Sequence, residues 1–517
     1  MTIAASVFLV LAQVLTTQYD NARTGATLTE RTLTPANVNA AHFGKLFAFA
    51  VDGDVYAQPL YVPRVDVPGK GIHDVVYIAT EHDSVYAFDA AGQPAEPLWH
   101  VSFLHADAGT VPAGDVRCPF IQPEIGITPT PAIDIRSGTI YVLARTRERA
   151  GFMQSRYVQR LHALAITTGA EKFGGPVEIQ ASVAGTGAGG SNGTVPFDPL
   201  RALPRAGLLV AGGQVYLTWA SSCDVGPYHG WLMAYDKVTL KQTAVLNTSP
   251  DSSESGIWQS DNGPAADAEG NVYVVTGNGA FDAATGGRDY GDSVMKVSLA
   301  GNRLAVRDYF TPANEKLLNA KDLDIGSGGP VLLPDQPGAH PHLLLVGGKD
   351  GRLFVLDRDR LGRHAPDNAS PSLQAVVFSG GIYSPVAYWN GHVYIWASND
   401  YLSDFSLTGG ALPSEPSARS TQKLTNPGAP LAISADGARN AVVWAIETKV
   451  WNAWSTEKPS VLHAFDAANV ARELYTSEQN AGRDRAGPAV RFTIPTIANG
   501  RVYVPAKREV DVYGLLK

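Results

Sequence analysis

Short stretches in which β-branched or aromatic residues alternate with polar residues recur along the whole chain. Each copy holds two such stretches separated by a polar gap, and the period of two predicts β-strands, because successive side chains of a strand point to opposite faces. The first stretches of the eight copies lie at 74–77, 139–141, 214–216, 271–273, 342–345, 392–394, 441–444 and 501–503. The second stretches lie at 84–89, 160–165, 231–236, 293–298, 352–357, 401–406, 461–466 and 509–513.

Each pair follows an apolar stretch marked by Pro or Gly, such as 58–62, and several pairs precede a fourth stretch, such as 97–101. Four short antiparallel strands per copy are typical of a propeller blade. A single hydrophobic core stops growing near about 250–300 residues, so stacked blades suit a chain of 517 residues. We therefore predict an all-β fold, an eight-bladed β-propeller of four-stranded antiparallel blades. A ring of seven blades with one aberrant copy is the structural alternative.

The two ends of the chain indicate how the ring closes. The last copy stops at Lys517, directly after its third strand. The stretch 44–51 alternates like a strand but has no copy of its own. Docking it onto the last copy would supply the missing fourth strand and cover an open edge. The sequence thus predicts one domain over 13–517, closed by an N-terminal strand.

An apolar run of thirteen residues, 3–15, opens the chain. It is shorter than the roughly 20 residues that cross a bilayer. It suits the apolar part of a secretory signal over 1–12, with cleavage after Ala12, although the first cationic side chain is Arg23. A first strand, or a start upstream of a fuller signal, is the alternative. We expect a periplasmic or secreted protein with no later membrane span.

The charge and the cysteine content exclude several classes of partner and cofactor. Lys+Arg number 41 and Asp+Glu 49, a formal charge of −8, without the basic cluster that nucleic-acid binding requires. Two cysteines exclude a disulfide framework, a zinc ribbon and an iron–sulfur cluster. In an oxidising compartment Cys118 and Cys223 could pair, and two unpaired thiols are the other outcome.

Three features carry a family resemblance: the Ala-x-Asp ending of the copies, as at 87–89, and the segments 18–26 and 157–164. The chain resembles exported bacterial proteins with the pyrroloquinoline-quinone (PQQ) type propeller repeat. That superfamily contains quinone-dependent dehydrogenases and also cofactor-free scaffolds. The chain lacks the adjacent Cys-Cys pair common in the dehydrogenases and a Cys-x-x-Cys-His haem site. The resemblance implies PQQ and calcium as cofactors, or no cofactor at all.

Insertions are concentrated in loops that would open on one face of the propeller. They comprise 104–123, 181–204 and 311–324 between blades, and 145–157, 221–229, 277–291 and 448–459 within blades. Loops that lengthen on one face of a rigid scaffold usually carry the function. We therefore expect a binding face for a small alcohol or sugar, a glycan or a protein partner.

Residues at the starts of the innermost strands should rim the central channel on that face. A tricarboxylate quinone needs cations, an aromatic wall and calcium held by oxygen ligands. We assign cofactor binding to Arg145, Trp258, Gln259, Lys349 and Arg491, and both the catalytic base and the calcium ligands to Glu124 and Asp324. Gln58, Arg205, Ser327 and Tyr383 belong to the same rim. The alternative for each charged residue is a structural ion pair.

Two hypotheses of function follow. The first is an oxidoreductase that transfers hydride from an alcohol or sugar to a bound quinone while a carboxylate accepts the hydroxyl proton. The second is a non-catalytic exported propeller that binds a glycan or a protein at the same face. A carbohydrate lyase is a third and weaker hypothesis.

Overall fold

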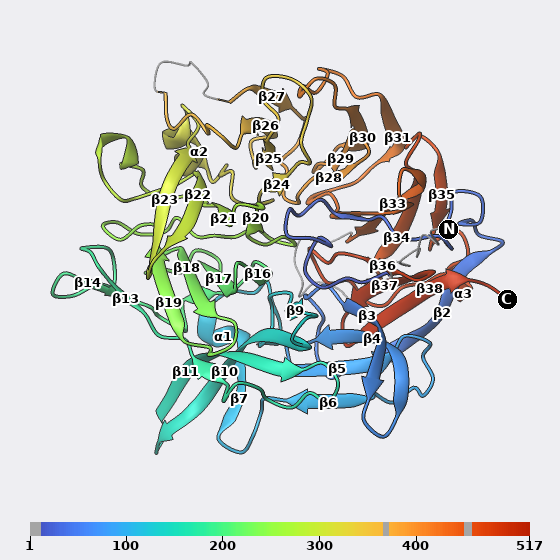
Figure 1. Cartoon of the computed structure of the whole chain (residues 1–517), viewed down its shortest axis with the longest axis horizontal. Helices are drawn as coiled ribbons and strands as arrows, with labels where there is room; N and C mark the ends of the chain where they lie inside the picture. The colour runs from blue at the N-terminus through green and yellow to red at the C-terminus, as the bar shows by residue number, and fades with distance from the viewer. Residues whose placement is uncertain (1–11, 153, 366–371, 449–457) are drawn as a thin grey trace, which may run out of the picture.

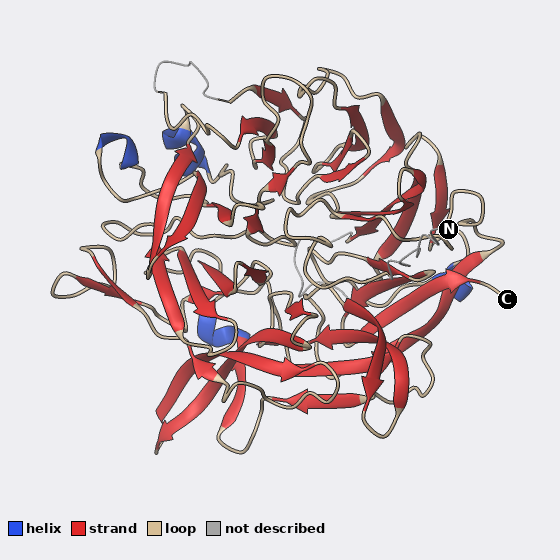
Figure 2. Cartoon of the chain, in the orientation of Figure 1, coloured by secondary structure: helices blue, strands red, loops and turns tan. Residues whose placement is uncertain are grey.

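Strands dominate the computed structural model (Figure 2). It describes residues 12–152, 154–365, 372–448 and 458–517. Residues 1–11 of the expected signal and most of the expected loop 448–459 therefore lie outside the described residues. None of the helices in the described ranges is long and apolar enough to cross a membrane.

Eight of the hydrogen-bonded sheets share a plan of four antiparallel strands, and we number them in chain order. Sheet 1 contains β3 (Leu60–Val67), β4 (Gly71–Ala79), β5 (Ser84–Asp89) and β6 (Trp99–Ser102). Sheet 2 contains β9 (Ala132–Asp134), β10 (Thr139–Gly151), β11 (Gln154–Ala165) and β12 (Val177–Glu178). Sheet 3 contains β16 (Leu209–Ala211), β17 (Gln214–Ser221), β18 (Trp231–Asp236) and β19 (Gln242–Asn247). Sheet 4 contains β20 (Ala265–Ala266), β21 (Asn271–Val275), β22 (Val294–Ala300) and β23 (Arg303–Phe310).

The second half of the chain repeats the plan. Sheet 5 contains β24 (Val331–Leu332), β25 (Leu343–Gly347), β26 (Arg352–Asp357) and β27 (Gln374–Val377). Sheet 6 contains β28 (Ala387–Trp389), β29 (His392–Trp396), β30 (Tyr401–Ser406) and β31 (Ala418–Lys423). Sheet 7 contains β32 (Leu431–Asp436), β33 (Arg439–Glu447), β34 (Val461–Asp466) and β35 (Glu473–Thr476). Sheet 8 contains β36 (Thr496–Ala498), β37 (Arg501–Ala506), β38 (Glu509–Leu515) and β2 (Phe43–Ala50).

Short strands and helical turns lie beside these sheets. β1 (Ala26–Thr27) pairs with β32 in parallel, and β15 (Ala202–Leu203) pairs with β17. β7 (Ala108–Pro112) pairs with β10 and with β8 (Glu124–Ile125), while β13 (Ser182–Ala184) and β14 (Thr194–Pro196) form a separate hairpin. The helical turns are α1 (Ala113–Val116), η1 (Ala283–Thr285), α2 (Glu315–Lys321) and α3 (Ala481–Asp484). Most of these elements lie in the insertions expected from the sequence.

The sheets follow one another around a common centre, with the first strand of each on the inside (Figure 1). The expected strand pairs all form, and β2 pairs antiparallel with β38 as the fourth strand of sheet 8. The last sheet also contacts the first, because the Thr496 hydroxyl donates a 2.6 Å hydrogen bond to the Pro59 carbonyl. The expectation that an N-terminal strand completes the last copy is confirmed.

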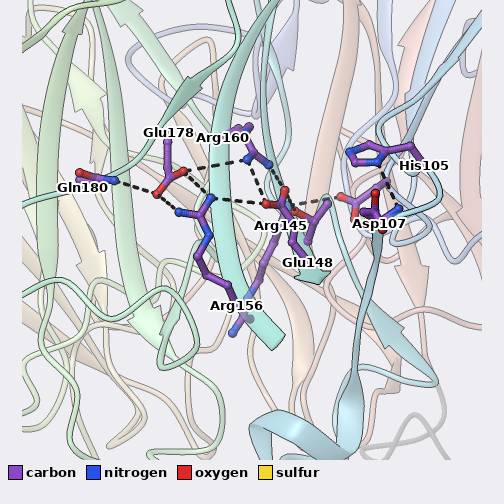
Figure 3. Close-up of polar contacts among 10 residues, drawn as sticks. His105, Asp107, Arg145, Glu148, Arg156, Arg160, Glu178 and Gln180 are labelled. Atoms are coloured by element: carbon purple, nitrogen blue, oxygen red, sulfur yellow. Dashed lines mark hydrogen bonds and ion pairs between the residues drawn. The ribbon is translucent and has the colours of Figure 1, made fainter. Parts of the chain in front are cut away.

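One insertion was assigned wrongly as a loop. Residues 145–157 continue the strands β10 and β11, which stay paired almost to their tip. Glu148 forms ion pairs with Arg156 (3.4 Å) and with Arg160 (Figure 3). Arg156 also forms an ion pair with Glu178, with 2.9 Å between nitrogen and oxygen. These cross-strand charges, with β7 on the outer edge, extend the hairpin beyond the sheet because opposite charges on one face stabilise strand pairing.

Apolar side chains of neighbouring sheets form the core. One cluster joins Tyr141 and Leu161 of sheet 2 to Trp219 and Trp231 of sheet 3, all with exposed fractions of 1% or less. Each sheet therefore buries its faces against its neighbours, as stacked repeats do.

Residues 14–30, which we call the central segment, run along the inner strands. The carbonyls of Asn21, Ala22, Thr24 and Gly25 accept hydrogen bonds of 2.8 Å from the first strands of sheets 4, 5, 6 and 7. Val14 bridges to Tyr61 in sheet 1. The segment thus satisfies backbone groups on the inner edge of the ring that would otherwise lack partners.

Arg23 fixes this segment although its side chain is completely buried. Its guanidinium donates to the Thr17 carbonyl (2.8 Å), the Thr16 hydroxyl (2.7 Å) and the Pro264 carbonyl (2.9 Å). Burial lowers the pKa of Arg23 to about 9, with Asp20 opposing the shift. The hydrogen bonds to carbonyl oxygens offset the cost of burying the charge.

Arg23→Met should lower the free energy of unfolding by about 3 kcal/mol, because several buried acceptors lose their donor. The measurement is chemical denaturation followed by circular dichroism. Arg31→Met is the matched control, since Arg31 lies just beyond the central segment with 65% of its side chain exposed and should change stability little. Equal effects of the two substitutions would contradict this role for Arg23.

Candidate functional site

A pocket of about 330 Å³ opens at the centre of the ring. Its wall includes residues that lie four to seven positions before the first strands of six sheets: Tyr56, Arg205, Trp258, Ser327, Tyr383 and Arg491. Residues of three insertions, 118–125, 221–224 and 322–324, complete the wall. The convergence of inner-strand residues and insertions on one pocket supports the expectation of a binding face.

Four of the seven residues assigned from the sequence line this pocket. They are Trp258, Asp324, Lys349 and Arg491. Glu124, Arg145 and Gln259 do not line it. The rim residues Arg205, Ser327 and Tyr383 are part of the wall.

One end of the pocket is built around Lys349. Its Nζ lies 2.6 Å from Asp322 Oδ1 and 2.5 Å from Asp324 Oδ2. Burial alone would lower the pKa of Lys349, but the charges of Asp324 and Asp322 outweigh it and raise that pKa. The Asp324 side chain is 1% exposed, and its Oδ1 accepts a 2.9 Å bond from the Gly326 amide. Lys349 is therefore a fixed cation beside a buried carboxylate.

Trp258 lies next to this ion pair, and a glycine makes room for it. A Cβ at Gly277 would lie 2.8 Å from Trp258 Cδ1 and 3.4 Å from Asp324 Cγ. The Gly277 amide is held by a 2.8 Å bond to the Gly256 carbonyl. The indole and the carboxylate therefore pack against bare backbone, which sets the position of both.

The other end of the pocket is a wall of arginines and aromatic rings. The Arg205 guanidinium lies 5.5 Å from the ring centres of both Tyr56 and Phe492. That of Arg491 lies 4.5 Å from Phe120 and 5.7 Å from Phe492. Burial lowers the pKa of Arg205, and it lowers the pKa of Arg491 to about 10. The rings stabilise these cations through their faces.

The Cys118–Cys223 disulfide also lines the pocket. Its Cα atoms are 5.4 Å apart, and it joins the insertion between sheets 1 and 2 to an insertion in sheet 3. Both cysteines pack with Val116, Ile121 and Leu203 in one apolar cluster. Of the two outcomes left open by the sequence, the structure contains the disulfide.

Glu124 lies elsewhere, on a cavity of about 270 Å³ that Asp52, Asp54 and Glu81 also line. His82 Nδ1 lies 2.8 Å from Glu124 Oε1, and the Thr110 hydroxyl donates a 2.8 Å bond to Glu124 Oε2. The structure thus places Glu124 and Asp324 on different cavities. Within the described ranges no group of three His, Cys, Asp or Glu side chains is arranged to hold a metal ion.

Arg145 and Gln259 have partners within the protein. Arg145, on β10 beside the network of Figure 3, is fully buried, and its side chain donates to the Leu200 carbonyl. Burial lowers its pKa to about 10. Gln259 is also fully buried, and its Oε1 accepts a 3.0 Å bond from the Val275 amide. Both residues support the wall of the ring instead of facing the pocket.

Tyr56, Phe120, Phe492 and Asp224 line the pocket and were not singled out from the sequence. Tyr56 stands two residues before the rim residue Gln58, and Phe492 directly follows Arg491. Their closeness in the sequence to predicted rim residues could have identified Tyr56 and Phe492 as pocket residues. Phe120 and Asp224 reach the pocket through insertions whose course depends on the disulfide.

Comparison with solved structures gives the fold. The quinohemoprotein alcohol dehydrogenase from Comamonas testosteroni superposes with a TM-score of 0.60 at 15% identity, covering 97% of this chain and 80% of that one. A second such enzyme, ADHIIG from Pseudomonas putida HK5, gives 0.56 at 14%, with the same coverage. BamB from Moraxella catarrhalis gives 0.50 at 13%, covering 91% and 99%. The fold is a β-propeller. No protein-family model and no curated protein sequence matches the chain.

Replacing both cysteines by serine should lower the free energy of unfolding by about 2–4 kcal/mol, because the bond constrains a long loop in the unfolded chain. Denaturant titration under non-reducing conditions is the measurement. The same titration with a thiol reductant should bring the unsubstituted protein to the same value. Two alkylatable thiols in the oxidised native protein would contradict the disulfide.

Proposed function

We propose that this protein is a quinone-dependent oxidoreductase that oxidises an alcohol or a sugar in the central pocket. The observation that carries the proposal is that Trp258, Lys349 and Asp324 line one end of a single pocket. An aromatic face, a fixed cation and a buried carboxylate are the groups that a planar anionic quinone and an alcohol require. The likeness to quinohemoprotein alcohol dehydrogenases supports this choice of chemistry.

The donor set fits PQQ. Trp258 is half-buried and offers a ring face to a planar ligand, and Lys349 offers a positive charge to its oxygens. When bound, the quinone supplies the two-electron acceptor that protein side chains lack.

Asp324 is the proposed base. Its carboxylate lies 2.5 Å from Lys349 Nζ, and the Gly326 amide donates a hydrogen bond that holds it in place. Asp324 accepts the hydroxyl proton of the substrate as the alcohol is oxidised. The Asp324 side chain is only 1% exposed, so little water competes with the substrate hydroxyl for its carboxylate.

Calcium is not part of the proposal. Glu124 and Asp324, the two ligands expected from the sequence, line separate cavities. Among the described residues, neither belongs to a group of three His, Cys, Asp or Glu side chains that could hold a metal ion. We derive no step through a metal.

Two structural expectations belong to the proposal. We take the eight sheets as the blades of one closed propeller, supported by the β2–β38 pairing and the contact between Thr496 and Pro59. We take the protein as periplasmic or secreted, supported by the Cys118–Cys223 disulfide, since such bonds persist in oxidising compartments.

Titration of the purified protein with PQQ should raise its thermal unfolding midpoint, because a ligand that binds only the native state stabilises it. The loaded protein should then reduce a phenazine dye when given an alcohol or a sugar. Lys349→Gln should weaken PQQ binding at least about tenfold, the loss of one charge-assisted contact. Lys45→Gln is the matched control, because Lys45 is equally exposed (21%) and lies 2.5 Å from the buried Asp511, away from the pocket.

Three outcomes can be separated. A higher midpoint with dye reduction supports the proposal. Binding without dye reduction for any alcohol or sugar would favour the non-catalytic propeller that binds a glycan or a protein. No change at saturating PQQ would overturn the quinone proposal.

Gly277→Ala should weaken PQQ binding by about tenfold or more, because the added methyl displaces Trp258. Quenching of tryptophan fluorescence by PQQ measures the affinity. Gly109→Ala is the control, since a Cβ there meets no atom within 4 Å. Unchanged affinity in Gly277→Ala would show that Trp258 does not contact the quinone.

A further inference from the structure

The arginine wall of the pocket has a property that the proposed oxidation at the Lys349 end does not use. Arg205 lines the pocket and contacts the rings of Tyr56 and Phe492. Among the described residues it donates no hydrogen bond and forms no ion pair. Its guanidinium lies over both rings, and its N–H groups can donate to a ligand.

Two acids lie near Arg205 without forming an ion pair with it. The acids whose charges reach it are Asp261 and Glu81. Burial raises the pKa of Asp261 well above its usual range, and it raises the pKa of Glu81 to about 7. A half-buried guanidinium without an ion-pair partner favours binding of an anion from solution.

Arg491 adds a second cation to the same wall. It is 6% exposed, and its guanidinium lies over the ring of Phe492, which Arg205 also contacts. Two guanidinium groups held by aromatic contacts are suited to a carboxylate, because little side-chain freedom remains to be lost on binding.

The two ends of the pocket differ in charge. Three carboxylates, Asp224, Asp322 and Asp324, surround the single cation Lys349 at one end. The other end holds two arginines. Because the acids offset the charge of Lys349, the second end attracts the carboxylate of a substrate more strongly than the first end does, and such a substrate has one preferred direction in the pocket.

We infer that Arg205 and Arg491 form a carboxylate-binding subsite, and that the substrate is therefore an alcohol or sugar that carries a carboxylate, such as a uronic acid. This inference rests on the proposed oxidation at the Lys349 end and specifies its substrate class. With the carboxylate at the arginines, the hydroxyl group at the opposite end of the substrate faces Asp324. Arg491, assigned to the cofactor from the sequence, serves the substrate in this arrangement.

The test is calorimetric binding of D-glucuronate and of D-glucose to the full chain without quinone, so it does not depend on quinone binding. The two sugars share a ring and differ at the carboxylate. Glucuronate should bind about 10- to 100-fold more tightly, the range expected of hydrogen bonds to a charged group. Added salt should weaken glucuronate binding only.

Arg205→Gln should bring the affinity for glucuronate close to that for glucose. Arg501→Gln is the matched control, because Arg501 also lies over an aromatic ring, 5.9 Å from the centre of Phe47, but does not line the pocket. Arg501→Gln should keep the preference for glucuronate. Circular dichroism checks the fold of both variants.

Equal affinities for the two sugars in the unsubstituted protein would overturn the subsite, even if Arg205→Gln fails to fold. A preference for glucuronate that survives in Arg205→Gln would overturn it as well. The proposed oxidation fails separately, if PQQ does not bind. A protein that binds PQQ and oxidises neutral alcohols without a preference for glucuronate would retain the proposed function and lose this inference.

Discussion

The first strand of every sheet faces the centre of the ring, where backbone amides need partners and where no further strand can be added. The central segment supplies these partners, since its carbonyls accept hydrogen bonds from four successive sheets. Arg23 anchors the segment by donating to the carbonyl of Thr17 in the segment and to that of Pro264, which directly precedes sheet 4. The ring and its inner edge therefore depend on a stretch of chain that belongs to none of the repeats.

The pocket depends on the same arrangement. Its wall is made of residues that precede inner strands, so their spacing is set by how the sheets pack around the central segment. Gln18 links the two regions, because its side-chain amide donates a 3.0 Å bond to the carbonyl of Asp261, directly after the pocket residue Ser260. The central segment thus helps to fix the backbone from which one part of the pocket wall is built.

The local alternation of apolar and polar residues was enough to predict most of the strands. The alternation at 84–89 or 231–236 predicts β5 and β18 directly, and the unpaired stretch 44–51 predicts the docking of β2. The extension of β10 and β11 was missed because its residues are mostly charged. A search for alternating hydrophobic residues does not detect strands that are stabilised by ion pairs. The role of the central segment was missed for a related reason: Gln18 and Arg23 are polar, and only the assembled ring buries them.

The site was predicted less completely than the fold. Trp258, Asp324, Lys349 and Arg491 line one pocket, because segments that precede or adjoin the inner strands meet at the centre of such a ring. Glu124 and Arg145 were separated from the others by hydrogen bonds to His82, Thr110 and Leu200 that no spacing in the sequence reveals. The positions of Phe120 and Asp224 could not be predicted without knowing that two cysteines 105 residues apart form a disulfide.

That bond has a topological consequence. Cys118 lies before sheet 2 and Cys223 lies in sheet 3, so all of sheet 2 falls within one covalently closed loop of chain. A protease that cuts the exposed tip near Phe152, which is 94% exposed, leaves both fragments joined and both halves of sheet 2 still paired with each other. The cleaved protein therefore keeps its circular architecture, and its two fragments separate only when the Cys118–Cys223 disulfide is reduced.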